Sequence, residues 1–518
     1  MDETSILRSF FFNRMSRTPN LPAVYDYCAN QRYTYGQLHQ RALKLSHFLK
    51  LRGLQKGDRV AILSRNDMVY IDLYYAYPYT GVITTSYNAR IGSDELNYLI
   101  QNESPKILFY SMEFVALLAS LRQQWPNCEY IRLEPGENPY GSLTYPQILS
   151  EFTDEPLDVL PIGMEDTIQL LHTGGTTGIP KAAMIPIRQV YYNAVGQQNA
   201  WNLRSCDRTV AYLPMFHTGT WNTVVTPMLY AGGLVVLVKH FHTEDLFEII
   251  PNERITILWG VPTIFRRMME HELFSVADFS SIIRCRCGAA PPELDLLQRY
   301  WEKGVCFCNG YGMTETSPGN LSMPADAMAI EDIRNKRTSC GKLMAYNEAK
   351  IIDESGNTVP VGQPGELLFR GNLLFSGYWN NKKETSAVLK DGWFYTGDIA
   401  SVDADGFYYL LGRKKNVYIT CGENIYPNEI MRTLLENPSI SESYVFGVPD
   451  KCKGEVGKAL VVLRQGCSLS EQQLRKFLEQ RLATIQQPTY LCFVSDIPKN
   501  AIGKVDTQII FKKYGLVN

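Results

Sequence analysis

The sequence has no excess of charge of either sign. Its 518 residues include 51 Lys and Arg against 53 Asp and Glu, a formal net charge of −2. A nucleic acid backbone or an anionic lipid surface attracts clustered positive charge, so this balance argues against nucleic acid as a partner. Hydrophobic residues make up 45% and aromatic residues 12%, which is enough for a large core and excludes a disordered scaffold.

Long uncharged runs and targeting signals are also scarce. The best candidate for a membrane span, residues 209–238, is interrupted by Asn222, Pro227 and the pair Gly232-Gly233. It therefore predicts a buried helix, a turn and a strand over 234–238, and we expect no transmembrane segment. The first residues lack a basic region followed by an apolar one, and the 12 cysteines are scattered. We therefore expect a reducing, cytoplasmic compartment.

Helix patterns alternate with short apolar strands over the first 300 residues. A helix pattern from Thr34 to Leu49 precedes a strand at 58–63, and the same order recurs over 242–259 and 293–308. Such alternation predicts parallel sheets with helices on both faces. No internal repeat interrupts it, and at roughly 150 residues per domain the length predicts about three domains.

The pattern changes after about residue 340. Short strands separated by glycine turns are expected at 349–353, 365–371 and 407–410, which indicates a barrel-like or mixed β region. A further break at 412–416 precedes about a hundred residues of mixed α/β pattern, with a helix expected over 470–482.

The most informative segment for chemistry is residues 170–181. An apolar strand end is followed by glycines that let backbone N–H groups turn towards an anion, by threonine hydroxyls that add donors, and by a lysine that adds a charge. The alternative is a flexible surface turn. The residues concerned are Thr173, Gly174, Gly175, Thr176, Thr177, Gly178 and Lys181. No Gly-Lys-Ser/Thr ends the segment, so the interpretation is a polyphosphate cradle of a different kind from the Walker loop.

This segment resembles the phosphate-binding loop of the adenylate-forming superfamily, which holds acyl- and aryl-CoA synthetases, peptide-synthetase adenylation domains and firefly luciferase. Four more segments follow in that superfamily's order. Residues 309–315 resemble its adenine-binding segment, 395–398 its ribose-binding turn, 411–415 its hinge, and 498–504 its catalytic-lysine loop. The chain is most similar to the acyl-CoA synthetases.

The resemblance implies a fold of class α/β. A large N-terminal domain over residues 1–412 would contain two doubly wound parallel-sheet subdomains and a β-barrel-like region. A hinge at 413–415 would join it to a small, mobile α+β C-terminal domain over 416–518. Rotation about the hinge would alternate an adenylate-forming with a thioester-forming orientation.

The resemblance also implies a nucleotide site, and the residue chemistry agrees with it. Tyr311 offers a face for adenine, Asp398 can accept both ribose hydroxyls with Arg413 as a second anchor, and Glu315 suits Mg²⁺ together with Thr173. The cofactor-binding residues expected for ATP, Mg²⁺ and CoA are Thr173, Gly174, Gly175, Thr176, Thr177, Gly178, Lys181, Asn309, Gly310, Tyr311, Gly312, Thr314, Glu315, Asp398, Arg413, Gly422, Lys504 and Arg90.

The implied reaction proceeds in two steps. A carboxylate oxygen attacks the α-phosphorus of ATP, giving an acyl-adenylate and pyrophosphate, and the acyl group then passes to a thiol. Charge gathers at the α-phosphoryl group, so positioned cations and donors supply most of the catalysis. We assign this role to Lys504, with Thr314 and His217 as the other catalytic residues.

CoA is the expected acceptor. Residues 422–430 resemble acyl-CoA synthetases more than peptide-synthetase domains, the chain ends at Asn518 without a carrier domain, and Arg90 matches a position that can reach CoA phosphates. An ordinary surface arginine is the alternative for Arg90. An acyl-AMP ligase that loads a separate carrier protein is the alternative for the whole chain.

The substrate is expected to be a small-molecule carboxylic acid. His217 matches the aromatic position at the carboxylate end of the acyl pocket, and Thr218 after it lacks the charge that holds an α-ammonium group. Trp221 would face the same way if this segment is helical, which favours a medium-chain or aryl acid. Residues 288–290 resemble the opposite wall of this pocket, which we expect to be apolar. The expected substrate-binding residues are His217, Trp221, Gly288, Ala289, Gly312 and Met313.

Two other interpretations are open to test. The units Cys285-Arg286-Cys287 and Cys306-Phe307-Cys308 could suggest zinc, but their strand spacing favours buried core cysteines. A non-catalytic ligand-binding protein of this fold would have lost Lys181, Glu315, Asp398 or Lys504, and all four are present.

Overall fold

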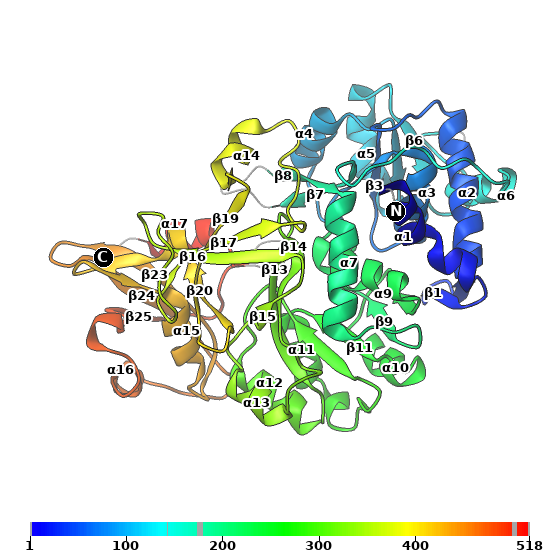
Figure 1. The fold of residues 1–518 in the computed structure, drawn as a ribbon. Helices are drawn as coiled ribbons and strands as arrows, with labels where there is room; N and C mark the ends of the chain where they lie inside the picture. Colours follow the sequence, from blue (N-terminus) through cyan, green and yellow to red (C-terminus); the bar gives the residue numbers. More distant parts are fainter. Residues whose placement is uncertain (1–2, 142, 174–179, 500–504, 516–518) are drawn as a thin grey trace.

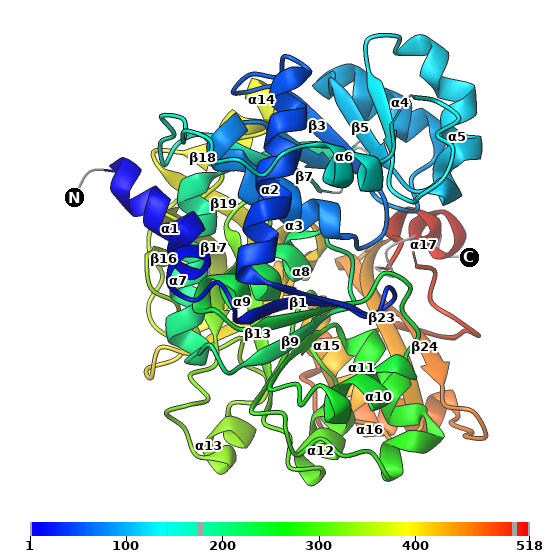
Figure 2. The same cartoon turned by 90° about the vertical axis from the view of Figure 1, so that its right-hand side faces the viewer.

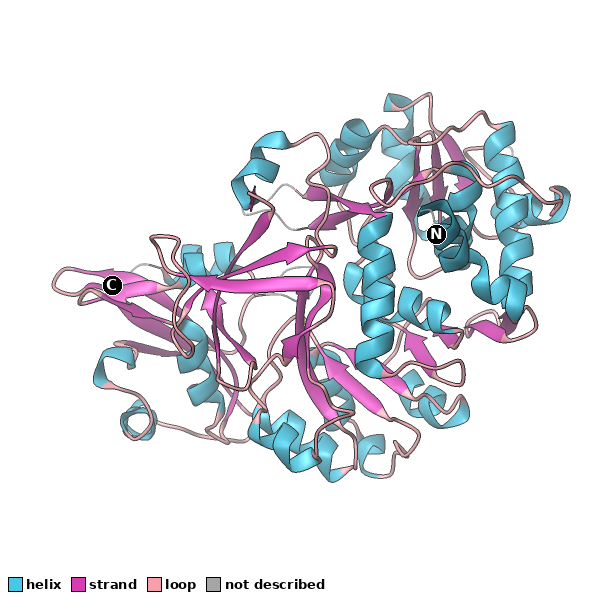
Figure 3. Cartoon of the chain, viewed as in Figure 1, coloured by secondary structure: helices cyan, strands magenta, loops and turns pink. Residues whose placement is uncertain are grey.

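The computed structural model describes residues 3–141, 143–173, 180–499 and 505–515. Four sheets form the interior, and helices lie mainly around them (Figure 3). The C-terminal part of the chain, orange to red in Figure 1, lies at one side of the molecule, and the N-terminal part lies at the other.

The first sheet has six strands in the order β6-β5-β3-β4-β7-β8. All neighbours are parallel except β7 and β8, which form an antiparallel pair. Its strands are β3 (Arg59–Leu63), β4 (Ile83–Ser86), β5 (Ile107–Tyr110), β6 (Glu129–Arg132), β7 (Thr167–Thr173) and β8 (Lys181–Pro186). The helices of this part are α1 (Glu3–Arg17), α2 (Tyr35–Leu51), α3 (Met68–Thr80), α4 (Ser93–Glu103), α5 (Val115–Leu121) and α6 (Tyr145–Glu151).

The second sheet has nine strands in the order β15-β14-β13-β12-β11-β9-β10-β1-β2. The run from β13 to β1 is parallel, and antiparallel strands close both edges. Its strands are β1 (Pro22–Asp26), β2 (Gln31–Thr34), β9 (Arg208–Ala211), β10 (Leu234–Leu237), β11 (Ile257–Gly260), β12 (Arg284–Cys287), β13 (Phe307–Met313), β14 (Ser317–Ser322) and β15 (Lys342–Leu343).

Helices cover both faces of this second sheet. One face packs against α7 (Ile187–Trp201), a three-residue α8 (Thr218–Thr220), a π-helix (Trp221–Val225) and α9 (Thr226–Ala231). The other face packs against α10 (Asp245–Asn252), α11 (Pro262–Glu270) and α12 (Leu294–Glu302), and α13 (Ile330–Asn335) follows further along the chain. Figure 2 shows β1, β9 and β13 of this sheet, with α10, α11 and α12 below them.

The later strands form two further sheets. An antiparallel one contains β16 (Asn347–Ile352), β17 (Gly365–Gly371), β18 (Leu389–Lys390), β19 (Trp393–Val402) and β20 (Tyr408–Arg413), with α14 (Lys382–Val388) beside it. The C-terminal one contains β21 (Tyr418–Thr420), β22 (Glu423–Ile425), β23 (Ile440–Asp450), β24 (Gly454–Leu463) and β25 (Tyr490–Phe493). Helices α15 (Pro427–Leu435), α16 (Glu471–Glu479) and α17 (Thr507–Tyr514) accompany the C-terminal sheet.

The expected fold class is confirmed, and so are the individual elements. The helix expected from Thr34 is α2, whose N-terminus is capped by the Thr34 side chain in a reciprocal pair with Gln37; this capping box explains why the helix starts there. The helices predicted over 242–250, 293–303 and 470–482 are α10, α12 and α16, each within three residues at either end. The predicted β region is the antiparallel sheet of β16 to β20. The division at 412 and 416 and the hinge stay predictions.

One large core is shared by the first three sheets, and a second core lies under the other face of the second sheet. The C-terminal sheet packs separately against α15 and α16 through Tyr418, Ile430, Leu434 and Leu474. The C-terminal part also contacts the rest of the chain through an ion pair, in which Arg464 Nη2 lies 2.9 Å from Asp295 Oδ2. Among the residues that the structure describes, no helix is both long and apolar enough to span a membrane.

Candidate active site

The expected phosphate loop connects β7 to β8. Thr173 and Lys181 are register partners at the open end of this antiparallel pair, so both ends of the loop are fixed by the sheet. Gly174, Gly175, Thr176, Thr177 and Gly178 lie outside the described residues. The structure therefore places the base of the loop and the two predicted ligands that flank it.

A buried ion pair anchors the strand that leads into this loop. His172 Nε2 lies 2.6 Å from Glu103 Oε1, and its Nδ1 lies 3.0 Å from the carbonyl oxygen of Ser86. Glu103 Oε2 accepts a hydrogen bond from the Thr85 hydroxyl at 2.6 Å. Both ring nitrogens face acceptors, which favours the doubly protonated imidazole. Burial lowers the pKa of His172, but the Glu103 carboxylate, the Ser86 carbonyl and Glu95 outweigh it and raise the pKa above its usual value.

Lys181 and Glu315 meet on the same aromatic side chain. The Tyr378 hydroxyl donates to Glu315 Oε1 at 2.7 Å, and Lys181 Nζ lies 5.3 Å from the centre of the Tyr378 ring. Lys181 also forms an ion pair with Glu384. The structure therefore brings together the predicted phosphate-binding lysine and the predicted metal-binding carboxylate, from segments more than 100 residues apart. A cation beside an oxygen ligand suits a metal-bound polyphosphate.

Tyr311, Asp398 and Arg413 form a second group. Tyr311 at the end of β13 donates from its hydroxyl to Asp398 Oδ2 at 2.6 Å, and Arg413 Nε pairs with Asp398 Oδ1 at 2.8 Å. Burial and the Asp398 carboxylate raise the pKa of the Tyr311 hydroxyl, which stays a donor at neutral pH. The Asp398 side chain is 8% exposed. The group offers an aromatic face, a buried carboxylate and a guanidinium, which suits a nucleoside.

The glycines of 309–315 permit close packing in this segment. A Cβ on Gly312 would lie 2.2 Å from the carbonyl carbon of Pro318, so only glycine fits there. Asn309 is buried, with its amide nitrogen 3.5 Å from Cys340 Sγ. The Thr314 carbonyl oxygen accepts a hydrogen bond from Gln189 Nε2 at 3.0 Å. These contacts hold the backbone of the predicted adenine-binding segment in one position.

The residues predicted for the acyl pocket lie before α8, directly after β12 and at the end of β13. His217 occupies the N-cap position of α8, and its ring lies 4.7 Å from that of Phe216. Gly288 follows β12 and faces the indole of Trp259, which also lies against Gly219. Ala289 is exposed with a φ of 67°, and Met313 ends β13. Met313 and Gly312 are half-buried and follow Tyr311 of the second group in the sequence.

A charged side chain lies close to the wall that is predicted to be apolar. Arg286 precedes Gly288 on the same face of β12, and it is buried with 5% exposure. Its Nη2 donates to the Leu321 carbonyl oxygen at 2.8 Å, and its Nη1 lies 3.4 Å from Gln197 Oε1 on α7. Strand alternation turns Cys285 and Cys287 to the opposite face, and this leaves a cation beside the predicted pocket.

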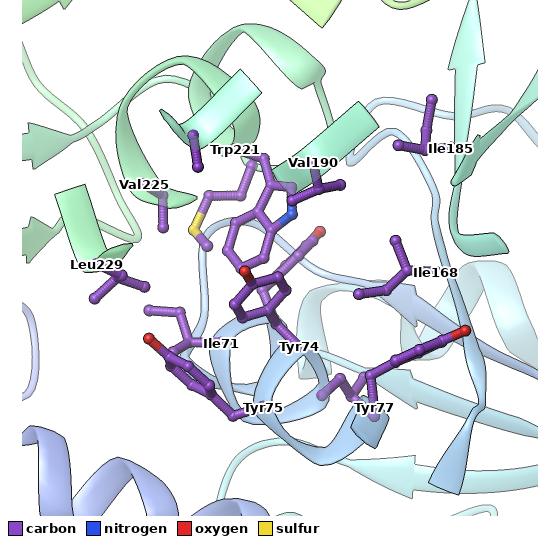
Figure 4. Close-up of a cluster of buried hydrophobic side chains, with 14 of the residues drawn as sticks. Ile71, Tyr74, Tyr75, Tyr77, Ile168, Ile185, Val190, Trp221, Val225 and Leu229 are labelled. Atoms are coloured by element: carbon purple, nitrogen blue, oxygen red, sulfur yellow. The ribbon is translucent and has the colours of Figure 1, made fainter. Parts of the chain in front are cut away.

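Trp221 lies in the hydrophobic core. It is 1% exposed, and its ring centre lies 5.6 Å from Tyr74 and 6.4 Å from Tyr70 on α3. Figure 4 shows the indole between Val190 and Tyr74, with Val225 and Ile71 nearby. These contacts favour a role for Trp221 in packing the core. Its role in the acyl pocket stays a prediction.

Three predicted residues remain, which are Lys504, Gly422 and Arg90. Lys504 lies outside the described residues, although the flanking Lys499 and Val505 form an antiparallel bridge and Lys499 Nζ pairs with Glu442 at 2.7 Å. Gly422 is exposed, with a φ of 86°, in the turn between β21 and β22. Arg90 is exposed near the end of the first sheet. Their roles stay predictions.

The paired cysteines behave as the strand spacing predicts. Cys285 and Cys287 are both buried on one face of β12, and all 12 cysteines are free thiols. Across the described ranges, no group of three or more His, Cys, Asp or Glu side chains is arranged to hold a metal ion.

Sequence reasoning missed four residues of these groups. Tyr378 and Glu384 come from the connection between β17 and β19, whereas Gln197 and Arg286 come from α7 and β12. Only Arg286 had a signal in the sequence, because a charged residue inside a short apolar strand is unusual.

Comparison with known proteins agrees with this arrangement. A family described as "AMP-binding enzyme" matches residues 11–379, and its C-terminal domain family matches residues 429–504. The chain is similar to a feruloyl-CoA synthase from an Amycolatopsis species, with 33% identity over 93% of this chain and 94% of that protein. It is also similar to an indoleacetate–CoA ligase from Aromatoleum aromaticum, with 33% identity over 91% of each chain. Among solved structures, ATP-bound MatB from Rhodopseudomonas palustris superposes with a TM-score of 0.87, at 28% identity over 98% of each chain.

Proposed function

The chain belongs to the AMP-binding enzyme family, and from this premise we propose that it is an AMP-forming acid–thiol ligase. It activates a carboxylic acid with ATP to an acyl-adenylate, releases pyrophosphate and transfers the acyl group to CoA. The observation that carries the proposal is the pair of groups around Tyr378 and Asp398, which together offer a polyphosphate site and a nucleoside site.

Each group has a separate task in the first step. Asp398 would accept the ribose hydroxyls, and Tyr311 would present its ring to adenine. Lys181 would leave Glu384 for the phosphates, since an ammonium pairs with either anion. His217 would position the reacting carboxylate, and Thr314 would donate to the nucleotide. Catalysis then consists mainly of positioning and charge stabilisation.

We propose Mg²⁺ as the metal. The residues fit it, because Glu315 is a hard oxygen ligand beside Lys181, and Thr173 ends the strand that leads into the phosphate loop. When bound, the ion would neutralise part of the polyphosphate charge.

We propose Lys504 as the cation that stabilises the α-phosphoryl transition state. Lys504→Ala should abolish adenylate formation yet leave thioester formation from a synthetic acyl-adenylate largely intact. The two half-reactions would be measured separately, by pyrophosphate release and by acyl-CoA formation. Equal loss of both would contradict a role restricted to the first step. Lys499→Ala, which removes a lysine on the same loop, serves as the matched control.

We propose an aryl or medium-chain acid as substrate and CoA as the acceptor. Two of the relatives are named for aromatic acids. The experiment is a panel of carboxylic acids with ATP and with CoA as the sole thiol. Acyl-CoA and AMP in equal amounts are expected. Release of pyrophosphate without thioester would favour the alternative, an acyl-AMP ligase that loads a carrier protein. A cytoplasmic location stays a prediction from the sequence.

A further inference from the structure

Arg286 is a buried cation without a carboxylate partner in the described parts of the chain. Its hydrogen bonds go to a backbone carbonyl and to the side-chain oxygen of Gln197, and its guanidinium lies over the Trp201 ring at 5.4 Å. The ionisable groups that act on it are the thiols of Cys340, Cys308 and Cys287. Burial lowers the pKa of Arg286 to about 10, and the side chain is still charged at neutral pH. A buried charge is costly unless an opposite charge or several acceptors satisfy it.

Two N–H donors at the contact between Arg286 and Gln197 have no acceptor among the described residues. They are Arg286 Nε and Gln197 Nε2, and both atoms are buried. The adjacent glycines leave the room that these side chains occupy, because a Cβ on Gly310 would lie 2.0 Å from Arg286 Nε and one on Gly319 would lie 2.1 Å from Gln197 Nε2. Buried donors in proteins nearly always have a partner, and unsatisfied ones call for an explanation.

The position of the pair relative to the predicted acyl pocket supplies that explanation. Arg286 and Gly288 are two residues apart and face the same side of the sheet, which separates them by about 7 Å along the strand. Trp259 on β11 is the register partner of Arg286 and covers Gly288. Gln197 approaches from α7 on the other side. An acid that extends past Gly288, with its reacting carboxylate at His217, would bring its far end towards these two donors.

We propose that Arg286 and Gln197 select acids that carry an oxygen acceptor, a second carboxylate or a phenolic oxygen, at the end remote from the reacting carboxylate. The inference rests on the proposed ligase function and narrows its substrate class. Arg286 supplies the charge, and its planar fork and the Gln197 amide supply the donors. An acid of the same shape with a methyl group at its far end would leave both donors without acceptors.

The test uses one scaffold with three substituents. Cinnamic acids with a para-carboxy, a para-hydroxy or a para-methyl group are compared as substrates of the full chain by ATP-dependent AMP formation, and kcat/KM is measured for each. Adipic and hexanoic acids form an aliphatic pair. We expect at least one oxygen substituent to exceed the methyl group by about 10- to 100-fold, the range expected for a hydrogen bond to a charged group. The ratio of the carboxy to the hydroxy acid tells which oxygen the site takes.

Variants then tie the preference to Arg286. Arg286→Met should bring the ratio of kcat/KM for the preferred oxygen-bearing acid to that for the para-methyl acid close to one, while activity with the para-methyl acid persists. Arg286→Lys should keep part of this preference. Arg284→Met, the same substitution two residues away on β12, should leave the ratio unchanged. If Arg286→Met does not fold, the substrate preference of the wild type and its partial loss in Arg286→Lys still test the proposal.

Two results would overturn the proposal. One is a wild type that uses the para-methyl acid as well as both oxygen-bearing acids. The other is an Arg286→Met protein that folds and keeps the wild-type ratio. Absence of AMP formation with every acid would instead contradict the ligase function itself, so the two failures are distinguishable.

Discussion

Some side chains near this site contact other polar site residues, and others pack into the hydrophobic core. This difference predicts whether a substitution affects activity or stability first. Tyr311 and Arg413 both contact Asp398, and the three side chains form the proposed nucleoside site. Trp221 is surrounded by core residues (Figure 4). Changes in the first group should affect the reaction, whereas changes in the second should affect stability first.

Trp221→Ala should lower the free energy of unfolding by about 3 to 5 kcal/mol, because it removes a large side chain that is 1% exposed from a packed cluster. Thermal or urea unfolding measures this loss, and unchanged stability would contradict the core position. The chain-length profile over a series of fatty acids is the second readout. A shift towards longer acids would add a role in the acyl pocket, and an unchanged profile would leave the core role alone.

The strand ends are the elements that position the predicted site residues. Strand β7 delivers Thr173, and β13 delivers Tyr311 to Met313. The helix and strand pattern could be predicted from the spacing of apolar residues, and the order of the five motifs predicted the fold class. The pairing of Glu315 with Tyr378 could not be predicted, because the two residues are 63 positions apart and only the folded chain brings them together. The partners of Arg286 likewise could not be predicted, because they depend on how β12 lies against α7 and β14 in the folded chain.

The His172–Glu103 pair at the end of β7 predicts a pH dependence. Since the pKa of His172 is raised in the folded protein, its stabilising contribution is fully present below the ordinary pKa of 6.5 and is lost as pH rises through the raised value. Glu103→Gln should therefore be destabilised relative to wild type, by several kcal/mol below about pH 6.5 and by less at higher pH.

The measurement is the melting temperature of both proteins across this pH range. Thr85→Val removes a hydrogen bond to Glu103 without changing the charge and serves as the control. If the difference in melting temperature between wild type and Glu103→Gln grows with pH, a protonated His172 is contradicted.

The hinge prediction concerns the short 3-10 helix Lys414–Asn416. Proline fixes φ near −65°, a value within the range of this helix, so Lys415→Pro should be tolerated in the orientation seen here. Rotation about the hinge requires a change of backbone angles, which proline opposes. We expect adenylate formation to persist and thioester formation to fall by about tenfold or more. Lys415→Ala controls for loss of the side chain, and normal rates of both steps in Lys415→Pro would remove Lys415 from the hinge.

The two parts of the chain meet through Asp295, which lies between Arg266 and Arg464. Burial raises the pKa of Asp295, but the two guanidinium groups outweigh it and lower the pKa below its usual value. The carboxylate is therefore charged at neutral pH. The Arg464 pair is part-exposed, so its contribution to the orientation of the C-terminal part should be modest and screened by salt.

Arg464→Ala should release this contact and expose the connecting segment. Trypsin cleaves after arginine and lysine, and residues 413–415 are exposed, so we expect faster cleavage there, by about fivefold at most for a surface pair. Wild type at high salt should approach the variant. Arg475→Ala breaks a pair within α16 and should cleave at the wild-type rate. Equal cleavage of all three proteins would show that the contact does not restrain the orientation.

The formation of an acyl-adenylate at one site is the claim on which the rest depends, and isotope transfer tests it most directly. The acid is supplied with both carboxylate oxygens replaced by a heavy oxygen isotope, together with ATP and CoA. The masses of the products are then measured by mass spectrometry. The account predicts one labelled oxygen in AMP, because that oxygen attacked the α-phosphorus, and one in the acyl-CoA. Unlabelled AMP, or label in pyrophosphate or phosphate, would contradict it.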